Sequence, residues 1–179
     1  MMNPQIVINT TIDKVENVLV YIKNCSFQQV KEYKISGKTL FDKIKIQEIL
    51  KELSKMKGRY IYVIESVGDN SLIKHIYETF SSFNNSEEGN ELKISKFNEN
   101  TSNTIYVGTS KALKTRLNQH FGYANKTTYS LHLIRWFPKN IDLTLGIYKV
   151  STDNKLGIEL IEQTIWDMKK PQFGKRSGL

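Results

Sequence analysis

The sequence predicts an α/β protein in which a small central sheet of about three strands is flanked by helices. Three runs rich in β-branched and aromatic residues predict the strands, at residues 60–64, 104–107 and 143–150. Segments with an apolar residue every three or four positions follow the second and third runs, at 111–120 and 157–169, and predict helices. A chain of 179 residues with 39% hydrophobic and 25% charged residues suits one globular domain with an extension.

Residues 1–57 are predicted to form a helical N-terminal extension. Apolar side chains recur at helical spacing over residues 11–23, with Thr10 or Thr11 as a candidate N-cap. A second helix is expected over residues 46–56, because a cationic run and then Gly58 follow it, as is typical of a helix end. The main domain is therefore expected to span residues 58–179.

The main domain contains a long connection between its first two strands. The run at 60–64 has no polar interruption, which suits a strand covered on both faces. Residues 66–103 are predicted to be an insertion, with a helix over 72–83 and a short strand over 92–97. Ser110 is the expected N-cap of the helix at 111–120. The last helix is expected to end before a proline and to turn four side chains inward: Ile158, Ile161, Ile165 and Met168.

The charge is concentrated in the C-terminal part of the chain. The net charge is +8, and residues 108–179 contain 12 basic and 5 acidic side chains. This excess predicts a polyanionic partner, although scattered lysines that only keep the chain in solution are the alternative. The single cysteine, Cys25, cannot form an internal disulfide, and no apolar run approaches about 18 residues. We therefore expect a reducing, cytoplasmic location and no membrane partner.

Four side chains of the chain complement one another for phosphodiester hydrolysis. Two strand tyrosines are followed by an arginine on the next helix and by a glutamate on the last helix. The planar fork of an arginine binds phosphate oxygens, and a carboxylate is a hard ligand that suits magnesium. A phenol beside a metal ion and cationic groups can have its pKa lowered far enough to act as a base.

These residues resemble the GIY-YIG nuclease family. Gly58-Arg59-Tyr60 stands where the family has Gly-Ile-Tyr, and Tyr106-Val107-Gly108 stands where it has Tyr-Ile-Gly. The arginine of the family lies eight positions after the second glycine, which gives Arg116. Four positions further, family members carry Tyr or His, and this chain has His120. The resemblance implies a GIY-YIG-like core preceded by the helical extension.

The C-terminal part of the resemblance identifies the metal ligand. The glutamate of the family lies nine residues before a proline, so Pro171 indicates Glu162 rather than Glu159. One Mg²⁺ (or Mn²⁺) ion on Glu162 is implied. Many members have an asparagine shortly after this proline, whereas this chain has Gly174.

The resemblance implies a metal-dependent endonuclease that hydrolyses DNA. Tyr60 would orient or deprotonate the attacking water with help from Tyr106 and His120, and Arg116 would bind the scissile phosphate. Tyr60, Tyr106, Arg116 and Glu162 are therefore expected to line one cleft within roughly 10 Å, the reach of one phosphate and its metal ion. The implied substrate is double-stranded DNA, the implied role is restriction or defence, and a homodimer is expected if both strands are cut.

Lys111 and Lys114 are expected to contact DNA phosphates together with Arg116, because they lie one helical turn apart. Plain solvation of these lysines is the alternative.

Three departures from the family pattern keep other functions open. Arg59 replaces an apolar residue, Gly174 replaces an asparagine, and the gap between the two tyrosine motifs is far longer than a dozen residues. The main alternative is a catalytically inactive nucleic-acid-binding module on the same fold. A third hypothesis is an adaptor that does neither, with Tyr60 and Tyr106 as core aromatics and His120 as a helix cap.

Overall fold

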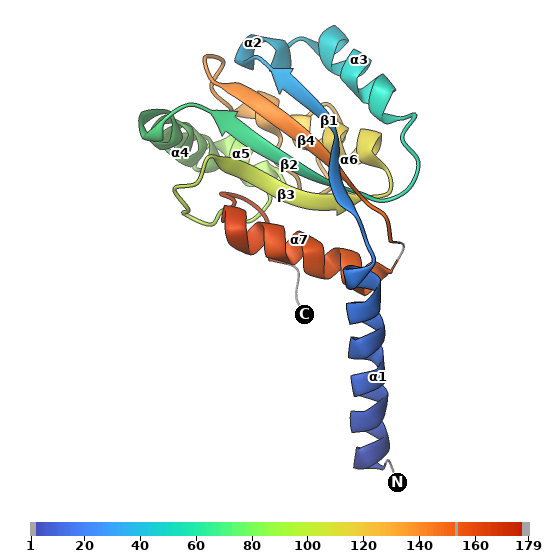
Figure 1. The fold of residues 1–179 in the computed structure, drawn as a ribbon. Coiled ribbons are helices and arrows are strands. Elements are labelled where there is room, and N and C mark those ends of the chain that lie inside the picture. Colours follow the sequence, from blue (N-terminus) through green and yellow to red (C-terminus); the bar gives the residue numbers. More distant parts are fainter. Residues whose placement is uncertain (1–2, 153, 177–179) are drawn as a thin grey trace.

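The computed structural model describes residues 3–152 and 154–176. Its centre is a four-stranded antiparallel sheet in the order β1-β4-β2-β3 (Figure 1). The strands are β1 (Phe27–Ile35), β2 (Tyr60–Val67), β3 (Thr104–Ser110) and β4 (Asp142–Val150). The helices are α1 (Pro4–Lys23), α2 (Gly37–Leu40), α3 (Lys43–Leu53), α4 (Asn70–Asn84), α5 (Glu87–Glu91), α6 (Leu113–Phe121) and α7 (Lys155–Lys169), with a 3-10 turn η1 (Leu133–Arg135). The predicted α/β class is confirmed.

The sheet has one strand more than the sequence predicted, because the N-terminal region contributes β1. This strand pairs with β4, from Phe27 opposite Val150 to Ile35 opposite Leu143. Seven of its nine residues are exposed. An exposed edge strand needs no alternation of apolar and polar residues, so its sequence gives little signal. The N-terminal region is thus helical, as predicted, and also completes the sheet.

The two faces of the sheet pack against different helices. Tyr60 and Tyr62 of β2 face the larger core, which includes residues of α3, α4 and α6. Ile61 and Val63 face the opposite way and pack with Ile158 of α7. Successive strand residues point to opposite faces. The uninterrupted apolar run in β2 therefore reflects burial on both faces, as the sequence predicted.

Several local predictions were wrong. No strand forms over residues 92–97; two isolated bridges there join Ile94 to Ser130 and Phe97 to Phe173. Ser110 is the last residue of β3, and α6 begins after Ala112 instead. Met168 is 78% exposed, and it lines an open groove of about 560 Å³ together with residues of α7 and the sheet. Within the described residues, no helix is both long and apolar enough to cross a membrane.

Candidate active site

A cluster of four side chains from β2, β3 and α6 lies on the larger-core face of the sheet. The rings of Tyr62 and Tyr106 are stacked, with centroids 6.0 Å apart. The Arg116 Nη2 donates to the Tyr106 hydroxyl at 3.2 Å, and the Tyr62 hydroxyl lies 3.0 Å from His120 Nε2. Arg116 and His120 are one turn apart on α6, so they share the helix face that covers the strands.

Gly108 makes room for this cluster. In the register of the sheet Gly108 lies opposite Tyr62. A Cβ atom at this position would lie 2.7 Å from both the Tyr106 ring and the Tyr62 hydroxyl. Any side chain here would therefore push the two phenols out of place. The glycine of the second motif has a packing role that the spacing of the motif alone does not reveal.

His120 is a buried, neutral histidine. Burial lowers the pKa of His120 well below its ordinary value, and the charge of Arg116 lowers it further. The His120 Nδ1 accepts a hydrogen bond from the Leu131 backbone N–H. A neutral imidazole carries one proton, so that proton resides on Nε2 and points to the Tyr62 hydroxyl. His120 therefore acts as a hydrogen-bond donor to Tyr62.

The low pKa of His120 predicts a loss of stability in mild acid. Below the ordinary histidine value of 6.5 the unfolded chain takes up a proton that the folded chain excludes. The free energy of unfolding should then decrease by up to about 1.4 kcal/mol per pH unit for this group. Urea unfolding at several pH values between 5 and 7.5 measures this slope.

The control for this slope is His75, which is exposed on α4. We expect His120→Gln to flatten the dependence on pH and His75→Gln to leave it unchanged. His132, whose pKa burial also lowers, accounts for part of the slope that remains. An identical slope in wild type and His120→Gln would contradict a neutral, buried His120.

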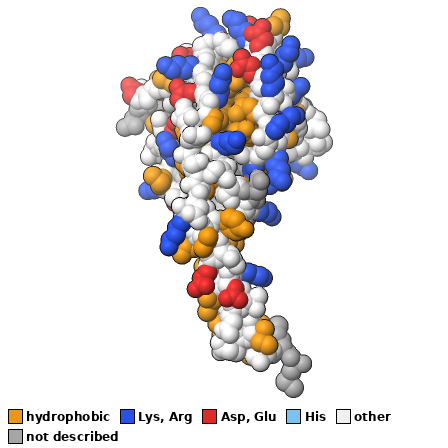
Figure 2. Space-filling view, turned by 45° about the vertical axis from the view of Figure 1, so that its right-hand side comes forward, with side chains coloured by type: hydrophobic (Ala, Val, Ile, Leu, Met, Phe, Trp, Pro, Cys, Tyr) orange, Lys and Arg blue, Asp and Glu red, His pale blue; other side chains and the backbone are white. Residues whose placement is uncertain are grey.

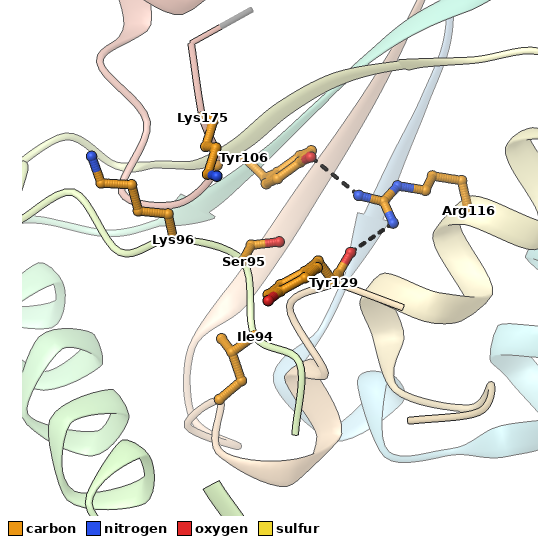
Figure 3. Close-up of a pocket in the computed structure, with 8 residues that line it drawn as sticks. Ile94, Ser95, Lys96, Tyr106, Arg116, Tyr129 and Lys175 are labelled. Carbon is orange, nitrogen blue, oxygen red and sulfur yellow. Dashed lines mark hydrogen bonds between the residues drawn. The ribbon is translucent and has the colours of Figure 1, made fainter. Parts of the chain in front are cut away.

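A cavity of about 370 Å³ opens beside Tyr106 and Arg116 (Figure 3). Lys96 and Lys175 lie on its other side, and among its described lining residues none is acidic. The Arg116 Nη1 donates to the Tyr129 carbonyl at 2.9 Å, which holds the guanidinium at the cavity wall. The ring of Tyr129 is 65% exposed. Three cations around one cavity suit a phosphate group.

The wall that carries the two lysines is built from segments far apart in the chain. The Gly174 N–H donates to the Lys96 carbonyl at 2.8 Å. The Asn98 side-chain amide donates to the carbonyls of Pro171 and Gly174. Asn98 thus supplies an amide to the same loop in which Gly174 replaces the asparagine of the family. Gly174 has a φ of +107° and lies against the Tyr106 ring, which favours glycine there.

Tyr60 lies on the same strand face as the cluster but directs its hydroxyl elsewhere. That hydroxyl donates to the Lys57 carbonyl at 3.0 Å. Tyr62, two residues later, contacts His120 and stacks on Tyr106. Sequence reasoning missed Tyr62 because residues two apart on a strand share one face. The signal for it was present, since Ile61-Tyr62 matches the Ile-Tyr of the first motif more closely than Arg59-Tyr60 does.

Glu162 approaches β3 from the face opposite the cluster. Burial raises the pKa of Glu162, while hydrogen bonds from Thr109 oppose the rise. Burial likewise raises the pKa of Tyr62, and the charges of Tyr106 and Glu162 add to that rise. The carboxylate is therefore within electrostatic range of the Tyr62 hydroxyl. Of the four residues expected to line one cleft, Tyr106 and Arg116 line the cavity, and Tyr60 and Glu162 lie outside its lining.

The residues present fit a single magnesium ion. The described residues contain no group of three or more His, Cys, Asp or Glu side chains able to enclose a metal. Magnesium needs no such cage, because it keeps several waters and is often held by one carboxylate and the phosphates of the substrate. Glu162, a half-buried carboxylate beside the Thr109 side chain, suits this role. Glu159 suits it less, because it is paired with Lys155 at 3.5 Å.

The lysines predicted to bind DNA lie outside this cavity. Lys111 precedes α6 and Lys114 lies in its first turn, and both are exposed. Their contact with DNA remains a prediction. Lys96 and Lys175, which do line the cavity, were missed. Lys175 directly follows Gly174, whereas Lys96 lies near no recognisable motif, and the backbone pairing of the two loops places both lysines at one cavity.

Comparison with known protein families identifies this part of the chain. Residues 94–175 match the family model of the GIY-YIG catalytic domain. These residues form a GIY-YIG domain. The resemblance seen in the sequence is thereby confirmed, and the family implies nuclease-type activity and generally a divalent metal. Comparisons with curated proteins and with solved structures gave no match.

The matched segment contains most of the predicted site of the GIY-YIG domain. Tyr106, Arg116, His120 and Glu162 all lie within it. The match begins at Ile94, inside the segment predicted as an insertion. Strand β2, with Tyr62, precedes the matched residues but pairs with β3 in the same sheet. The sheet thus includes two strands, β1 and β2, that lie outside the matched residues.

Proposed function

We propose that this chain is a metal-dependent endonuclease that hydrolyses phosphodiester bonds in double-stranded DNA. The observation that carries the proposal is the contact of Arg116 with Tyr106 at the wall of a cavity that also presents Lys96 and Lys175. The GIY-YIG domain supports a nuclease. The cationic cavity supports a nucleic-acid substrate whose phosphate enters beside the phenol of Tyr106.

Arg116 is proposed to bind the scissile phosphate. Its guanidinium is oriented before substrate arrives, because Nη1 and Nη2 donate to the Tyr129 carbonyl and to the Tyr106 hydroxyl. A preorganised donor stabilises charge that develops in the transition state without the cost of reorganising at that moment. Lys96 and Lys175 extend the positive charge to phosphates on either side.

Tyr62 is proposed to take the role predicted for Tyr60. Its oxygen accepts the Nε2 proton of His120, and this hydrogen bond orients the phenol. The charge of Arg116 lowers the pKa of Tyr62 against the effect of burial. With a phosphate and a water in the site, the phenols of Tyr62 and Tyr106 would orient the water, and one of them would receive its proton only as the phenolate, after releasing its own proton to solvent. Mg²⁺ or Mn²⁺ on Glu162 would supply Lewis-acid stabilisation of the phosphate and leaving oxygen.

The position of β3 supports joint action of Glu162 and Arg116. Strand β3 lies at the edge of the sheet, and residues 172–173 pair with its outer side only along residues 104–106, so among the described residues the part from Val107 to Ser110 is the open part of this edge. A DNA strand laid along this edge would meet Arg116 on one face and Glu162 on the other. Gly108 has no side chain on the face of β3 that carries the Tyr62–Tyr106 cluster.

The assignment of Tyr62 predicts different effects for two neighbouring tyrosines. Tyr62→Phe should reduce cleavage by about 10² or more, the usual contribution of a positioned acid or base. Tyr60→Phe should cleave at close to the wild-type rate, because its hydroxyl is bound only to the Lys57 carbonyl. Both variants remove one hydroxyl from the same face of β2, and initial rates of plasmid cleavage measure the difference.

Thermal unfolding of both tyrosine variants completes the comparison. Removing the Tyr62 hydroxyl leaves the His120 N–H without an acceptor, at a cost of about 1–3 kcal/mol. Rates are therefore compared at a temperature where both variants are folded. A larger loss of cleavage in Tyr60→Phe than in Tyr62→Phe would show that Tyr60, and not Tyr62, orients or deprotonates the attacking water.

Plasmid cleavage distinguishes the proposal from its alternatives. An endonuclease converts supercoiled plasmid to nicked or linear DNA with Mg²⁺ and stops when the metal is chelated. An inactive binding module, suggested by Arg59 in electrostatic range of Glu162, retards DNA in gels in a salt-sensitive manner and never cuts. An adaptor does neither.

The products of the same assay address the finer predictions. Direct conversion to linear DNA supports a homodimer that cuts both strands, as a restriction or defence enzyme in the cytoplasm would. Accumulation of nicked circles indicates an enzyme that cuts one strand at a time.

A further inference from the structure

Helix α1 projects from the body of the protein and carries apolar side chains into solvent. Figure 1 shows that only its C-terminal end meets the rest of the chain. At that end Val18 is buried and Ile22 lies beside Gly157 of α7. Figure 2 shows apolar side chains along the projecting helix. Eight apolar residues of α1 are between 43% and 63% exposed: Ile6, Val7, Ile8, Ile12, Val15, Leu19, Val20 and Tyr21.

Four of these residues form a stripe along one side of the helix. Ile8, Ile12, Val15 and Leu19 follow one another at intervals of four, three and four residues. This is the spacing of the two apolar positions of a heptad repeat, which in a coiled coil pack against the same positions of a partner helix. We call these four residues the α1 seam.

The composition of α1 indicates that the α1 seam is covered in the folded protein. Its projecting part is rich in Ile, Val, Asn and Thr, which are poorer helix formers than Ala, Leu, Lys or Glu. An isolated helix of about 15 residues is marginal in water even with good helix formers. A helix of this composition therefore gains most of its stability from burial of an apolar face. The body of the same chain does not cover the α1 seam, because all four of its residues are exposed.

We propose that the α1 seam packs against the α1 seam of a second copy of this chain and so forms a homodimer. The seam is self-complementary, because two copies of α1 packed in parallel or antiparallel orientation bring the apolar residues of one helix against those of the other along the whole seam. The charged side chains of α1 are balanced, two acidic and two basic, so two copies meet without net repulsion. The rest of the chain carries the net charge of +8.

The same charge balance disfavours the other occupants of an apolar helix face. Helices that lie on membranes typically carry lysines and arginines on the polar face. The side of α1 opposite the seam carries Thr10 and Asn17 together with the exposed Ile6 and Tyr21, and the basic residues of the helix are only Lys14 and Lys23. A nucleic-acid partner would also require a cationic surface. A second copy of a neutral, self-complementary helix therefore fits the α1 seam best.

The dimer does not rest on the proposed nuclease activity. Helix α1 lies outside the residues that match the GIY-YIG domain, and the catalytic cluster is complete within one chain. Assembly can therefore be measured without DNA or metal. The dimer would contain two copies of the cluster around Arg116, one in each chain, and the two α1 helices would connect the chains.

Sedimentation velocity of the full chain tests the proposal. We expect a particle of twice the 20.8 kDa chain mass at micromolar concentration. Ile12→Glu/Val15→Glu places charges in the α1 seam and should give a monomer. Thr10→Glu/Asn17→Glu adds the same charge to the opposite side of the same helix and should stay dimeric. A monomeric wild type, or a dimer that survives the seam charges, would overturn the proposal.

A second control separates the α1 seam from the open groove at the end of α7. That groove is lined by Ile161, Ile165 and Met168, and it could hold an apolar segment of another chain. Because Met168 is 78% exposed, Met168→Glu should fold normally and remain dimeric. Dissociation by Met168→Glu together with an intact dimer in Ile12→Glu/Val15→Glu would move the interface to the groove.

Discussion

Arg116→Ala should reduce DNA cleavage by about 10²–10³, the usual cost of removing a preorganised donor from a charged transition state. Arg116 lines the cationic cavity and donates a hydrogen bond to the Tyr106 hydroxyl. Arg116→Lys should restore little of the rate, because an ammonium group cannot bind the Tyr129 carbonyl and a phosphate oxygen with one planar fork. Initial rates of plasmid cleavage with Mg²⁺ measure both effects.

Arg135 is the matched control for Arg116. It lies on η1, and its Nη1 is paired with Glu88 at 3.0 Å, so it contributes charge but no contact to the cluster. Arg135→Ala should cleave at close to the wild-type rate. Circular dichroism should show the same fold in all variants. Cleavage by Arg116→Ala at the wild-type rate would exclude Arg116 as the phosphate ligand.

Glu162→Gln should remove Mg²⁺-dependent cleavage, with a loss of about 10² or more. The amide has the shape of the carboxyl group but lacks the charge that holds a hard divalent ion. Its effect on stability should be small or favourable, because burial already raises the pKa of Glu162 and so disfavours the charged form. Cleavage rates over a range of Mg²⁺ concentrations measure the first effect, and urea unfolding measures the second.

Glu159→Gln is the matched control, one turn earlier on α7. It removes one carboxylate from the same helix and breaks only the ion pair with Lys155. Exposed ion pairs contribute about 0–1 kcal/mol, so fold and activity should both survive. If Glu159→Gln lost activity and Glu162→Gln kept it, the metal would belong to Glu159.

The sequence predicted the parts of the site that depend on local spacing. Helix α6 begins three residues after β3, so a fixed count from Gly108 reaches Arg116 on the face that covers Tyr106. The same argument places His120 one turn later. The spacing did not decide which tyrosine of β2 joins the cluster, because Tyr60 and Tyr62 share one face of that strand.

Features that depend on long-range pairing could not be predicted. Lys96 and Lys175 line the same cavity because the loop of Lys96, which has no motif, pairs through its backbone with the loop of Gly174. Strand β1 was missed because its exposed side chains carry no alternation. The prediction that Met168 points inward failed for a related reason. The helical period identifies an apolar stripe, but tertiary packing decides how much of it is covered, and Ile158 is buried where Met168 is exposed.

The order of strands has a consequence for how the protein is made. Strand β1 near the N-terminus pairs with β4, and β4 separates it from β2, the next strand in sequence. During synthesis the first strand must therefore wait until residues 142–150 have left the ribosome. Contacts between distant parts of a chain form late and slow folding. A nascent chain thus gains its complete sheet only after β4 has emerged.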